Sequence, residues 1–305
     1  MPKRRAFTLV EMLIVVSIIG LLLGITLSAL SGAQKRGMKT RELNRLRQVV
    51  LAWTMYSGQS GEQVLPGFLD VPTQTTWGVN YRNRAGADLD RSLSQTYSWR
   101  LLPFLDFNLD PMMGHRDPVD MSIDESDFRV PPGMPALPAE FDTAATLPGA
   151  GAAIEPGFGY NAFYLGGWWT NSVMVFGDAR YTEGTIQQRG KVVSRSTSHI
   201  RRPSEINCFV SSTWRAPGRL NEPFDLLEGF GWCVPPRLAE TQVWSLTDGA
   251  LDVLSTQAVP LPRYGSTVSV GFCDGHTGNN SLENLEDPRA WIGNASSRTF
   301  QHTTN

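Results

Sequence analysis

A single carboxylate, Glu11, stands at the start of a long apolar segment near the N-terminus. Residues 12–30, which follow it, contain no charged residue and no proline. Such a run is long enough to cross the hydrocarbon core of a membrane as a helix. An ionised side chain in that layer costs about 2.5–3.5 kcal/mol and usually has a partner. The Glu11 carboxylate could therefore pair with a cation inside the apolar layer. The alternative is that its side chain reaches back to the lipid headgroups.

Reactive side chains also gather near the C-terminus, at Cys273, Asp274 and His276. The Cys-x-x-His spacing is that of two zinc ligands, but a zinc site needs four, and the sequence contains no second closely spaced pair. The dipeptide Asp274-Gly275 is typical of a tight turn, because glycine adopts positive φ without strain. We therefore expect a turn here rather than a metal site.

The three cysteines allow one disulfide and one free thiol. A bond between Cys208 and Cys233 would leave Cys273 free, although spacing alone does not decide the connectivity. A hydrolase would need a thiol with a histidine and a carboxylate, for which Cys273 with His199 or His276 is the available set. No nucleophile motif surrounds these residues, so we expect no enzyme.

Two stretches offer the oxygen ligands that calcium prefers. Neither has the spacing of an EF-hand loop, so we expect solvated acidic loops and no cofactor, with calcium as the alternative. The stretches are Asp106, Asp110, Asp117, Asp120, Asp124, Glu125 and Asp127, and then Asp274, Asn279, Asn280, Asn284 and Asp287.

Nine tryptophans, two of them adjacent at Trp168-Trp169, are a further chemical feature. Exposed indole rings stack on the faces of sugars, which would fit a carbohydrate-binding module. Aromatic side chains serve equally well in a hydrophobic core or in a subunit interface. The sequence leaves both interpretations open.

Composition separates a short basic arm from a large acidic remainder. Residues 1–50 contain nine Lys and Arg and two acids, whereas the other residues contain 18 Lys and Arg and 27 acids. A nucleic-acid-binding domain would carry its basic surface on the folded part, which argues against that class. The 305 residues, 41% of them hydrophobic, can form a sizeable core. The mean hydropathy of −0.20 excludes a polytopic membrane protein but leaves room for one spanning segment.

The elements that must position these residues begin with a long helix. No proline occurs between Pro2 and Pro66, so one helix can run over residues 7–57, with residues 9–30 crossing a membrane. Gly58 is the predicted cap. One helix face is apolar and suited to packing on a domain, and the other is polar. The apolar stripe is Leu43, Leu46, Val50 and Trp53, and the polar face is Arg41, Arg45, Arg47 and Gln48.

After Gly58 the pattern changes to short apolar runs separated by Gly, Pro, Asn and Asp. The region 106–157 is predicted to be a long irregular surface insertion. The predicted fold class is α+β, with a long N-terminal helix packed on an antiparallel β-rich head of residues 58–305. The predicted strands are 172–176, 206–211, 242–246 and 267–273.

The segment Arg5-Ala6-Phe7-Thr8-Leu9-Val10-Glu11 resembles the processing site of type IV pilin-like proteins, which include the pseudopilins of type II secretion. The resemblance implies a leader of residues 1–6, cleavage between Ala6 and Phe7 by a prepilin peptidase, and methylation of the new amine. Ala6 stands where the family normally has glycine. Glu11 matches the glutamate that the family places fifth in the mature chain. In the family, this carboxylate pairs with the terminal amine of a neighbouring subunit, here that of Phe7, and sets the register of assembly.

The resemblance also implies a location. The N-terminus would be cytoplasmic, the helix would cross a bacterial inner membrane once, and the head would be periplasmic or otherwise extracytoplasmic. The charges that flank the apolar run do not favour this orientation by themselves, because basic residues follow the run as well as precede it. Those that follow are Lys35, Arg36, Lys39, Arg41, Arg45 and Arg47.

Shorter pieces resemble one branch of the family with a large periplasmic head. That branch shows a histidine, nine residues and then Asp-Gly, and here Tyr264 stands in place of the histidine before Asp274-Gly275. The resemblance is dense over residues 7–56 and absent from the insertion. The pieces are Ser98-Trp99-Arg100-Leu101-Leu102-Pro103, Gly159-Tyr160-Asn161, Arg202-Pro203-Ser204-Glu205 and Phe272-Cys273-Asp274-Gly275-His276.

Together these features predict a structural protein. It would be a pseudopilin that a prepilin peptidase processes and that assembles through its N-terminal helix into a filament of a type II secretion system or a type IV pilus. Its partners would be the peptidase, other pilin-like subunits, the secretion or pilus machinery and the membrane, with no nucleic acid. The first alternative is a membrane-anchored module that binds carbohydrate or protein, and the second is a metal-dependent or Cys/His hydrolase.

Overall fold

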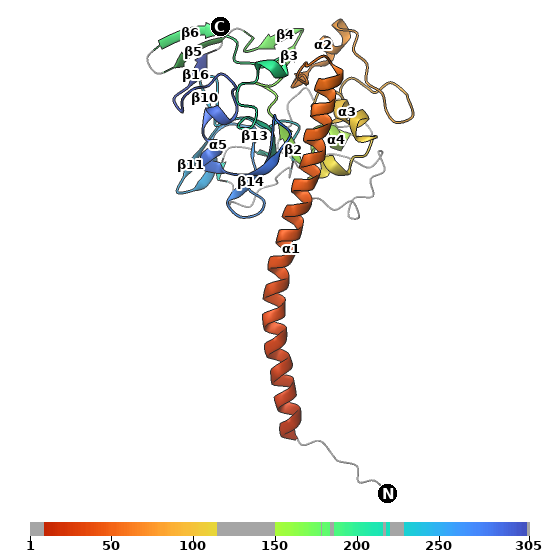
Figure 1. Cartoon of the computed structure of the whole chain (residues 1–305), viewed down its shortest axis with the longest axis vertical. Helices are drawn as coiled ribbons and strands as arrows, with labels where there is room; N and C mark the ends of the chain where they lie inside the picture. The colour runs from red at the N-terminus through yellow and green to blue at the C-terminus, as the bar shows by residue number, and fades with distance from the viewer. Residues whose placement is uncertain are drawn as a thin grey trace. The chain divides into compact units, whose positions relative to one another are not determined.

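The computed structural model of the chain describes residues 9–114, 150–177, 179–183, 186–215, 218–219 and 229–303 (Figure 1). The chain divides into two compact units, Met1–Arg41 and Glu42–Asn305. Helix α1, Leu9–Gln59, belongs to both. All strands of the described residues belong to the second unit, so the head has an α+β fold with mainly antiparallel sheets, as predicted.

Helix α1 confirms the predicted long helix, although its end differs. The predicted start at Phe7 lies outside the described residues. Gly58 lies inside the helix rather than at its cap. The chain turns away at Gly61 and Glu62, whose φ angles are 65° and 64°. The Glu62 N–H donates to the carbonyl of Ser57 at 2.9 Å, so the left-handed turn that ends the helix uses the next glycine along the chain.

A five-stranded sheet forms the centre of the second unit. Its longest strand, β7 (Asn207–Arg215), pairs antiparallel with β14 (Thr267–Phe272), and β15 (Thr277–Ser281) extends the sheet beyond β14. Strands β2 (Phe158–Tyr160) and β13 (Gln257–Pro260) pair with successive parts of β7. The predicted strands 206–211 and 267–273 are thus confirmed, and the structure shows that they are neighbours in the sheet.

Smaller sheets and short helices complete the unit, and the predicted strands 172–176 and 242–246 correspond to β4 and to β10 with β11. The small sheets contain β1 (Phe68–Leu69), β3 (Trp168–Thr170) and β4 (Val173–Val175); β9 (Arg237–Leu238) and β10 (Thr241–Gln242); β8 (Gly218–Arg219), β11 (Trp244–Thr247) and β12 (Ala250–Val253); and β5 (Ala179–Glu183), β6 (Ile186–Gly190) and β16 (Gln301–Thr303). The α-helices are α2 (Val71–Thr76), α3 (Tyr97–Leu101), α4 (Ala150–Ile154) and α5 (Leu282–Leu285), and the 3-10 turns are Leu102–Leu105, Asp110–Met113, Thr197–His199 and Pro288–Ala290.

The apolar face of α1 packs into the core of the head. Of the predicted stripe, Leu46, Val50 and Trp53 are fully buried, and Leu43 is half-buried. Strand β14 presents Gly271 to this face. A Cβ there would lie 2.4 Å from Cγ2 of Val50 and 3.4 Å from Cδ1 of Leu46, which shows how closely helix and sheet approach. The helix face is therefore part of the sheet's own hydrophobic core.

Two charged residues of α1 are buried along with this face. Glu42 accepts a hydrogen bond from the Ser211 hydroxyl of β7, and its other oxygen lies 3.5 Å from Nη1 of Arg263. Arg45, predicted to be on the polar face, is buried instead. It forms an ion pair with Asp110 at 2.5 Å and donates to the Gly114 carbonyl at 2.9 Å. Helical spacing alone assigned Arg45 to solvent because these partners come from distant segments.

The predicted surface insertion 106–157 is partly core. Residues 115–149 lie outside the described residues. On either side of that gap, Met112, Met113, Ala153 and Ile154 are fully buried. The Gly157 N–H donates to the Met112 carbonyl at 2.6 Å, which joins the two flanks. The Pro- and Gly-rich composition of these flanks predicted a surface loop. In the structure, the small and ring-constrained residues instead allow close packing of the backbone.

Arg100 is buried in the core with 1% of its surface exposed. Its Nε donates to the Thr96 carbonyl at 2.7 Å, Nη1 donates to Pro66 at 2.6 Å, and Nη2 donates to Gly67 at 2.7 Å and to Gln95 at 3.2 Å. Burial lowers the pKa of Arg100. The side chain ties helix α3 to the segment that enters β1, because the guanidinium supplies donors for carbonyls that no longer reach water.

We expect Arg100→Met to lower the free energy of unfolding by about 3 kcal/mol, because it keeps the packing but leaves several buried carbonyls without a donor. Urea unfolding of the detergent-solubilised chain, followed by tryptophan fluorescence, measures this. The control is Arg82→Met, since the Arg82 side chain is 70% exposed and pairs with the exposed Asp88. Such a pair contributes about 0–1 kcal/mol. Equal losses of unfolding free energy in the two variants would contradict a structural role for the hydrogen bonds of Arg100.

Candidate functional site

The described part of the first unit is an apolar helix with exposed side chains. An 18-residue window of α1 has a mean hydropathy of 2.7 and is 0% buried, so by length and composition the helix can cross a membrane. Exposed side chains include Leu13 at 62%, Val16 at 65% and Leu21 at 67%. A continuous apolar surface of this kind marks contact with lipid or with other apolar helices.

Glu11 lies in the first described turn of α1 and is exposed there. Further along, the hydroxyls of Ser17 and Thr26 donate to the carbonyls of Leu13 and Leu23, at 2.8 and 3.1 Å. A hydroxyl can thus be satisfied by its own helix. A carboxylate has no proton to give to a carbonyl, so in an apolar layer it requires a donor or a cation. Ala6 and Phe7, the predicted processing residues, lie outside the described residues.

The Asp274-Gly275-His276 segment is the turn between β14 and β15. Gly275 has a φ of 99°, the Gly275 N–H donates to the Phe272 carbonyl at 3.1 Å, and the Asp274 carboxylate accepts from the His276 backbone N–H at 3.2 Å. The His276 ring stacks on Phe272. Burial raises the pKa of Asp274, but hydrogen bonds from His276 outweigh it and leave the pKa below its usual value. These contacts show that Asp274-Gly275 forms a tight turn between the two strands, as predicted.

The three cysteines lie in the described residues as buried, free thiols. The predicted pair Cys208–Cys233 is not bonded in this structure, and the thiol that interacts with Cys208 is that of Cys273, which directly follows the adjacent strand β14. Register explains this, because the Cys273 N–H donates to the carbonyl of Ile206 at 3.1 Å. Burial raises the pKa of the Cys208 and Cys233 thiols well above the usual value. Neither is therefore an activated thiolate.

Several of the predicted calcium ligands that the structure describes are engaged with neighbouring side chains. Asp110 pairs with Arg45, and Asp287 pairs with Arg289 at 2.7 Å and with Arg298 at 3.1 Å. Asn284 donates to Asn280 at 3.1 Å. Within the described ranges, no group of three or more His, Cys, Asp and Glu side chains is arranged to hold a metal ion. The predicted ligands between 117 and 127 lie outside those ranges.

The adjacent tryptophans have different environments. Trp168 is half-buried and stacks between Phe68 and Phe163, with ring centroids 4.1 and 4.6 Å away, so it packs against the core cluster. Trp169 lines a surface cavity together with Trp77. Strand alternation explains the difference, since successive side chains of β3 point to opposite faces. No sequence pattern indicates Trp77 as a partner of Trp169, because only the fold brings the two indoles together.

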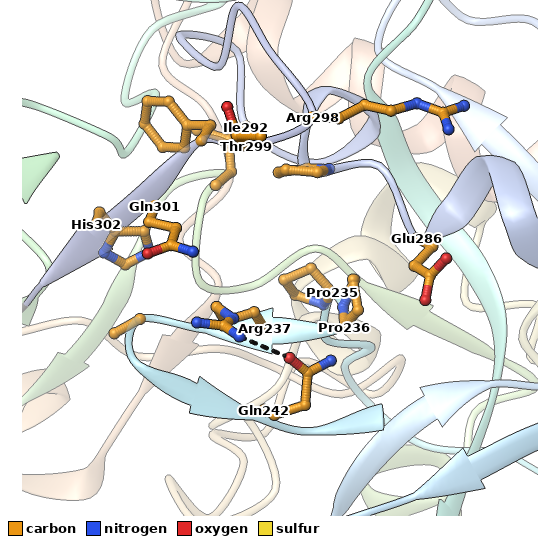
Figure 2. Close-up of a pocket in the computed structure, with 13 residues that line it drawn as sticks. Pro235, Pro236, Arg237, Gln242, Glu286, Ile292, Arg298, Thr299, Gln301 and His302 are labelled. Atoms are coloured by element: carbon orange, nitrogen blue, oxygen red, sulfur yellow. Dashed lines mark hydrogen bonds between the residues drawn. The ribbon is translucent and has the colours of Figure 1, made fainter. Parts of the chain in front are cut away.

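A second cavity, of about 310 Å³, lies between the C-terminal segment and the β9–β10 hairpin (Figure 2). His302 of β16 is buried beside it, and its Nε2 lies 2.6 Å from the Tyr164 hydroxyl. Burial lowers the pKa of His302 to about 4, so the ring is neutral at pH 7. Arg237 donates to Gln242 at 3.0 Å across the hairpin. Figure 2 shows His302 and Gln301 on one side of the cavity and Glu286 on the other.

His302 predicts a pH dependence of stability. Its pKa is about 4 when folded and about 6.5 when unfolded, so the unfolded chain takes up the proton first. The contribution of the neutral His302 ring to the free energy of unfolding is complete above pH 6.5 and is lost as the pH falls towards 4. Between pH 7 and pH 5 we expect the free energy of unfolding to fall by about 2 kcal/mol more in the unaltered chain than in His302→Gln. Denaturant unfolding at the two pH values measures this, and identical losses would contradict it.

The comparisons with known proteins bear on the N-terminus alone. The family described as the prokaryotic N-terminal methylation motif matches residues 1–27. No curated protein and no solved structure matches the chain. The matched residues contain Ala6, Phe7 and Glu11 and reach into the exposed apolar part of α1. The methylation motif, in register with the exposed apolar helix, supports a relationship of this chain to the type IV pilin-like proteins.

Proposed function

We propose that the chain is a non-enzymatic structural subunit of a filament belonging to a type II secretion system or a type IV pilus. The observation that supports this most directly is the methylation motif at residues 1–27 in register with an exposed apolar helix. Prepilin peptidase would remove residues 1–6 and methylate the amine of Phe7. The motif and helix indicate a single-pass membrane anchor, with the N-terminus cytoplasmic and the head extracytoplasmic in this proposal.

Assembly depends on the cost of burying the charge of Glu11 in an apolar layer. In the stored subunit, Glu11 reaches the cytoplasmic headgroups, because it stands at the start of the apolar run. In the filament, the headgroups are replaced by apolar helices, and the amine of Phe7 in a neighbouring subunit neutralises the carboxylate. Removing one partner of a buried ion pair costs about 3–5 kcal/mol. Only the register that pairs the two groups avoids this cost, so the pair selects the stagger between subunits.

The head contributes the second half of α1 to its own core, which leaves the first half for contacts with other subunits. Residues such as Leu46 and Val50 are buried by the sheet, whereas Leu13 and Val16 are exposed. A subunit with this distribution of apolar surface is folded before assembly and still has an apolar helix to bury. This distribution of apolar surface supports a structural role over a hydrolase.

We expect Glu11→Leu to insert into the membrane at least as well as the unaltered chain but to lose register in assembly, because the carboxylate that pairs with the Phe7 amine is gone. A photo-crosslinking residue at Ile18, which is exposed on α1, should give crosslinked dimers in cells that drop about tenfold in the variant. Glu11→Gln should behave likewise, since an amide cannot neutralise the amine. Glu283→Leu, an exposed site on α5, is the control. Unchanged crosslinks would show that Glu11 only reaches the headgroups.

We expect the mature chain to begin at methylated Phe7, because the peptidase recognises the basic leader, the small residue at position 6 and the apolar run. Mass spectrometry of the membrane-extracted protein identifies this terminus. Ala6→Gly should leave cleavage intact or improve it. A terminus near Ala33 would instead identify an ordinary signal peptide and would contradict the proposed function.

A further inference from the structure

A surface cavity of about 330 Å³ in the head has an unusual combination of side chains. It lies within the second unit, between the segment that follows α1 and the segment that follows β6. We call it the tryptophan pocket and define it by the lining residues Trp77, Trp169, Lys191, Arg195, Ser196 and His199. Its size is at the lower end of the range for sites that bind small molecules.

Two indole rings form the apolar part of the tryptophan pocket. Trp77 and Trp169 meet edge to face, with ring centroids 4.9 Å apart at 72°. Trp77 is 40% exposed, whereas Trp53, Trp244 and Trp291 are almost fully buried in the core. An indole that remains in water beside a cavity keeps a large apolar face available, and such a face is a common platform for a flat apolar surface of a ligand.

The position of Trp169 is fixed before any ligand arrives. Its Nε1–H donates to the Gly166 carbonyl at 3.0 Å, and the guanidinium carbon of Arg195 lies 5.3 Å from the centre of its ring. Gly166 has a φ of 71°, and a Cβ there would come 1.9 Å from the Leu65 carbonyl oxygen. The Val64 N–H donates to the Arg195 carbonyl at 3.0 Å. Preorganisation of this kind lowers the entropy cost of binding.

The charges around the pocket are all of one sign. The charged side chains that line it are those of Lys191 and Arg195, both exposed, and no Asp or Glu is among its lining residues, all of which the structure describes. The chain beyond residue 50 has nine more acids than bases, so this local balance departs from that of the head. Two other cavities of the head combine arginines with acids, Glu286 in one and Glu205 and Asp287 in the other.

We propose that the tryptophan pocket binds an acidic sugar residue of a glycan. The apolar face of the sugar ring would lie on an indole, and its carboxylate would bind Arg195 and Lys191. A guanidinium beside a carboxylate forms strong, directional hydrogen bonds. A sugar fits better than a nucleic acid, because a polynucleotide follows an extended basic groove, whereas the basic residues here surround one small cavity on an acidic head. This binding activity is independent of filament assembly and is tested separately from it.

The test uses the full-length chain in detergent, titrated with galacturonate and glucuronate, as monosaccharides and as short oligomers, and followed by tryptophan fluorescence and calorimetry. Neutral galactose and glucose oligomers are the matched ligands without a carboxylate. We expect the acidic sugars to bind at least about tenfold more tightly than the neutral ones, since a hydrogen bond to a charged group contributes about 1.5–3 kcal/mol. Added salt should weaken their binding.

Variants separate the two parts of the pocket. Arg195→Gln and Lys191→Gln should each weaken the acidic sugar about tenfold and leave the neutral sugar unchanged, whereas Trp77→Ala should weaken both. Arg237→Gln, which changes an arginine of the other cavity, is the control and should have no effect. The Arg195 and Lys191 side chains are exposed, so the unfolding curves of their variants should coincide with that of the unaltered chain. These two variants test the proposal even if Trp77→Ala folds poorly.

Three outcomes would overturn the proposal. The first is the absence of saturable binding to every acidic sugar tested. The second is equal affinity for acidic and neutral sugars, which would remove the role of the cations. The third is tighter binding of a single-stranded oligonucleotide than of any acidic sugar, which would assign the pocket to nucleic acid. Each result leaves the crosslinking and processing of the N-terminal helix untouched.

Discussion

Burial of one face of α1 in the central sheet is the interaction on which the head depends. Val50 and Leu46 pack so closely on β14 that only glycine fits at position 271. Glu42 then accepts a hydrogen bond from Ser211 of β7 and faces Arg263. Each buried apolar side chain contributes about 1.5–3 kcal/mol, and the charged pair is stable only while both partners are in place. Helix and sheet therefore fold as one unit.

This constraint gives one helix two environments. From Glu42 onward, the face of α1 that meets the sheet is core, whereas the large apolar side chains described between Leu9 and Leu30 are exposed. A helix of about 30 Å of apolar length suits a membrane or a bundle of similar helices. The apolar surroundings that the exposed part of α1 needs must then come from outside the subunit. The match to the methylation motif extends to residue 27 and so reaches into this exposed part, which connects the need of the apolar surface for a partner with the assembly role that we propose.

The head also has chemistry that assembly does not explain. Arg100 supports the backbone from inside, and His302 is a neutral buried ring, so both act on stability. The tryptophan pocket differs, because its indoles and cations remain in contact with water and stabilise little by themselves. Residues of this kind are explained better by a ligand than by folding. A filament subunit with such a pocket would expose a binding surface wherever its head reaches the outside.

Features that depend on neighbours in the chain could be predicted from the sequence. The apolar run, the absence of proline and the position of Glu11 fix a long helix and a processing motif, because helix formation and peptidase recognition are local. The Asp274-Gly275 turn and the alternating strand that precedes it were predictable for the same reason. The buried ends of the insertion were not, since their Gly- and Pro-rich composition is equally typical of surface loops.

Only the tertiary structure decided which polar residues would be buried and which reactive ones would meet. Arg45 and Arg100 are charged residues that the sequence would assign to the surface, but both are buried in the structure. Carbonyls and carboxylates from remote segments accept their hydrogen bonds. The thiol beside Cys208 is that of Cys273, which strand pairing across more than sixty residues brings near. Trp77 and Trp169 meet for the same reason. Spacing along the chain carries no information about such contacts, because the packing of sheets and helices, and not the local period, sets the distance between them.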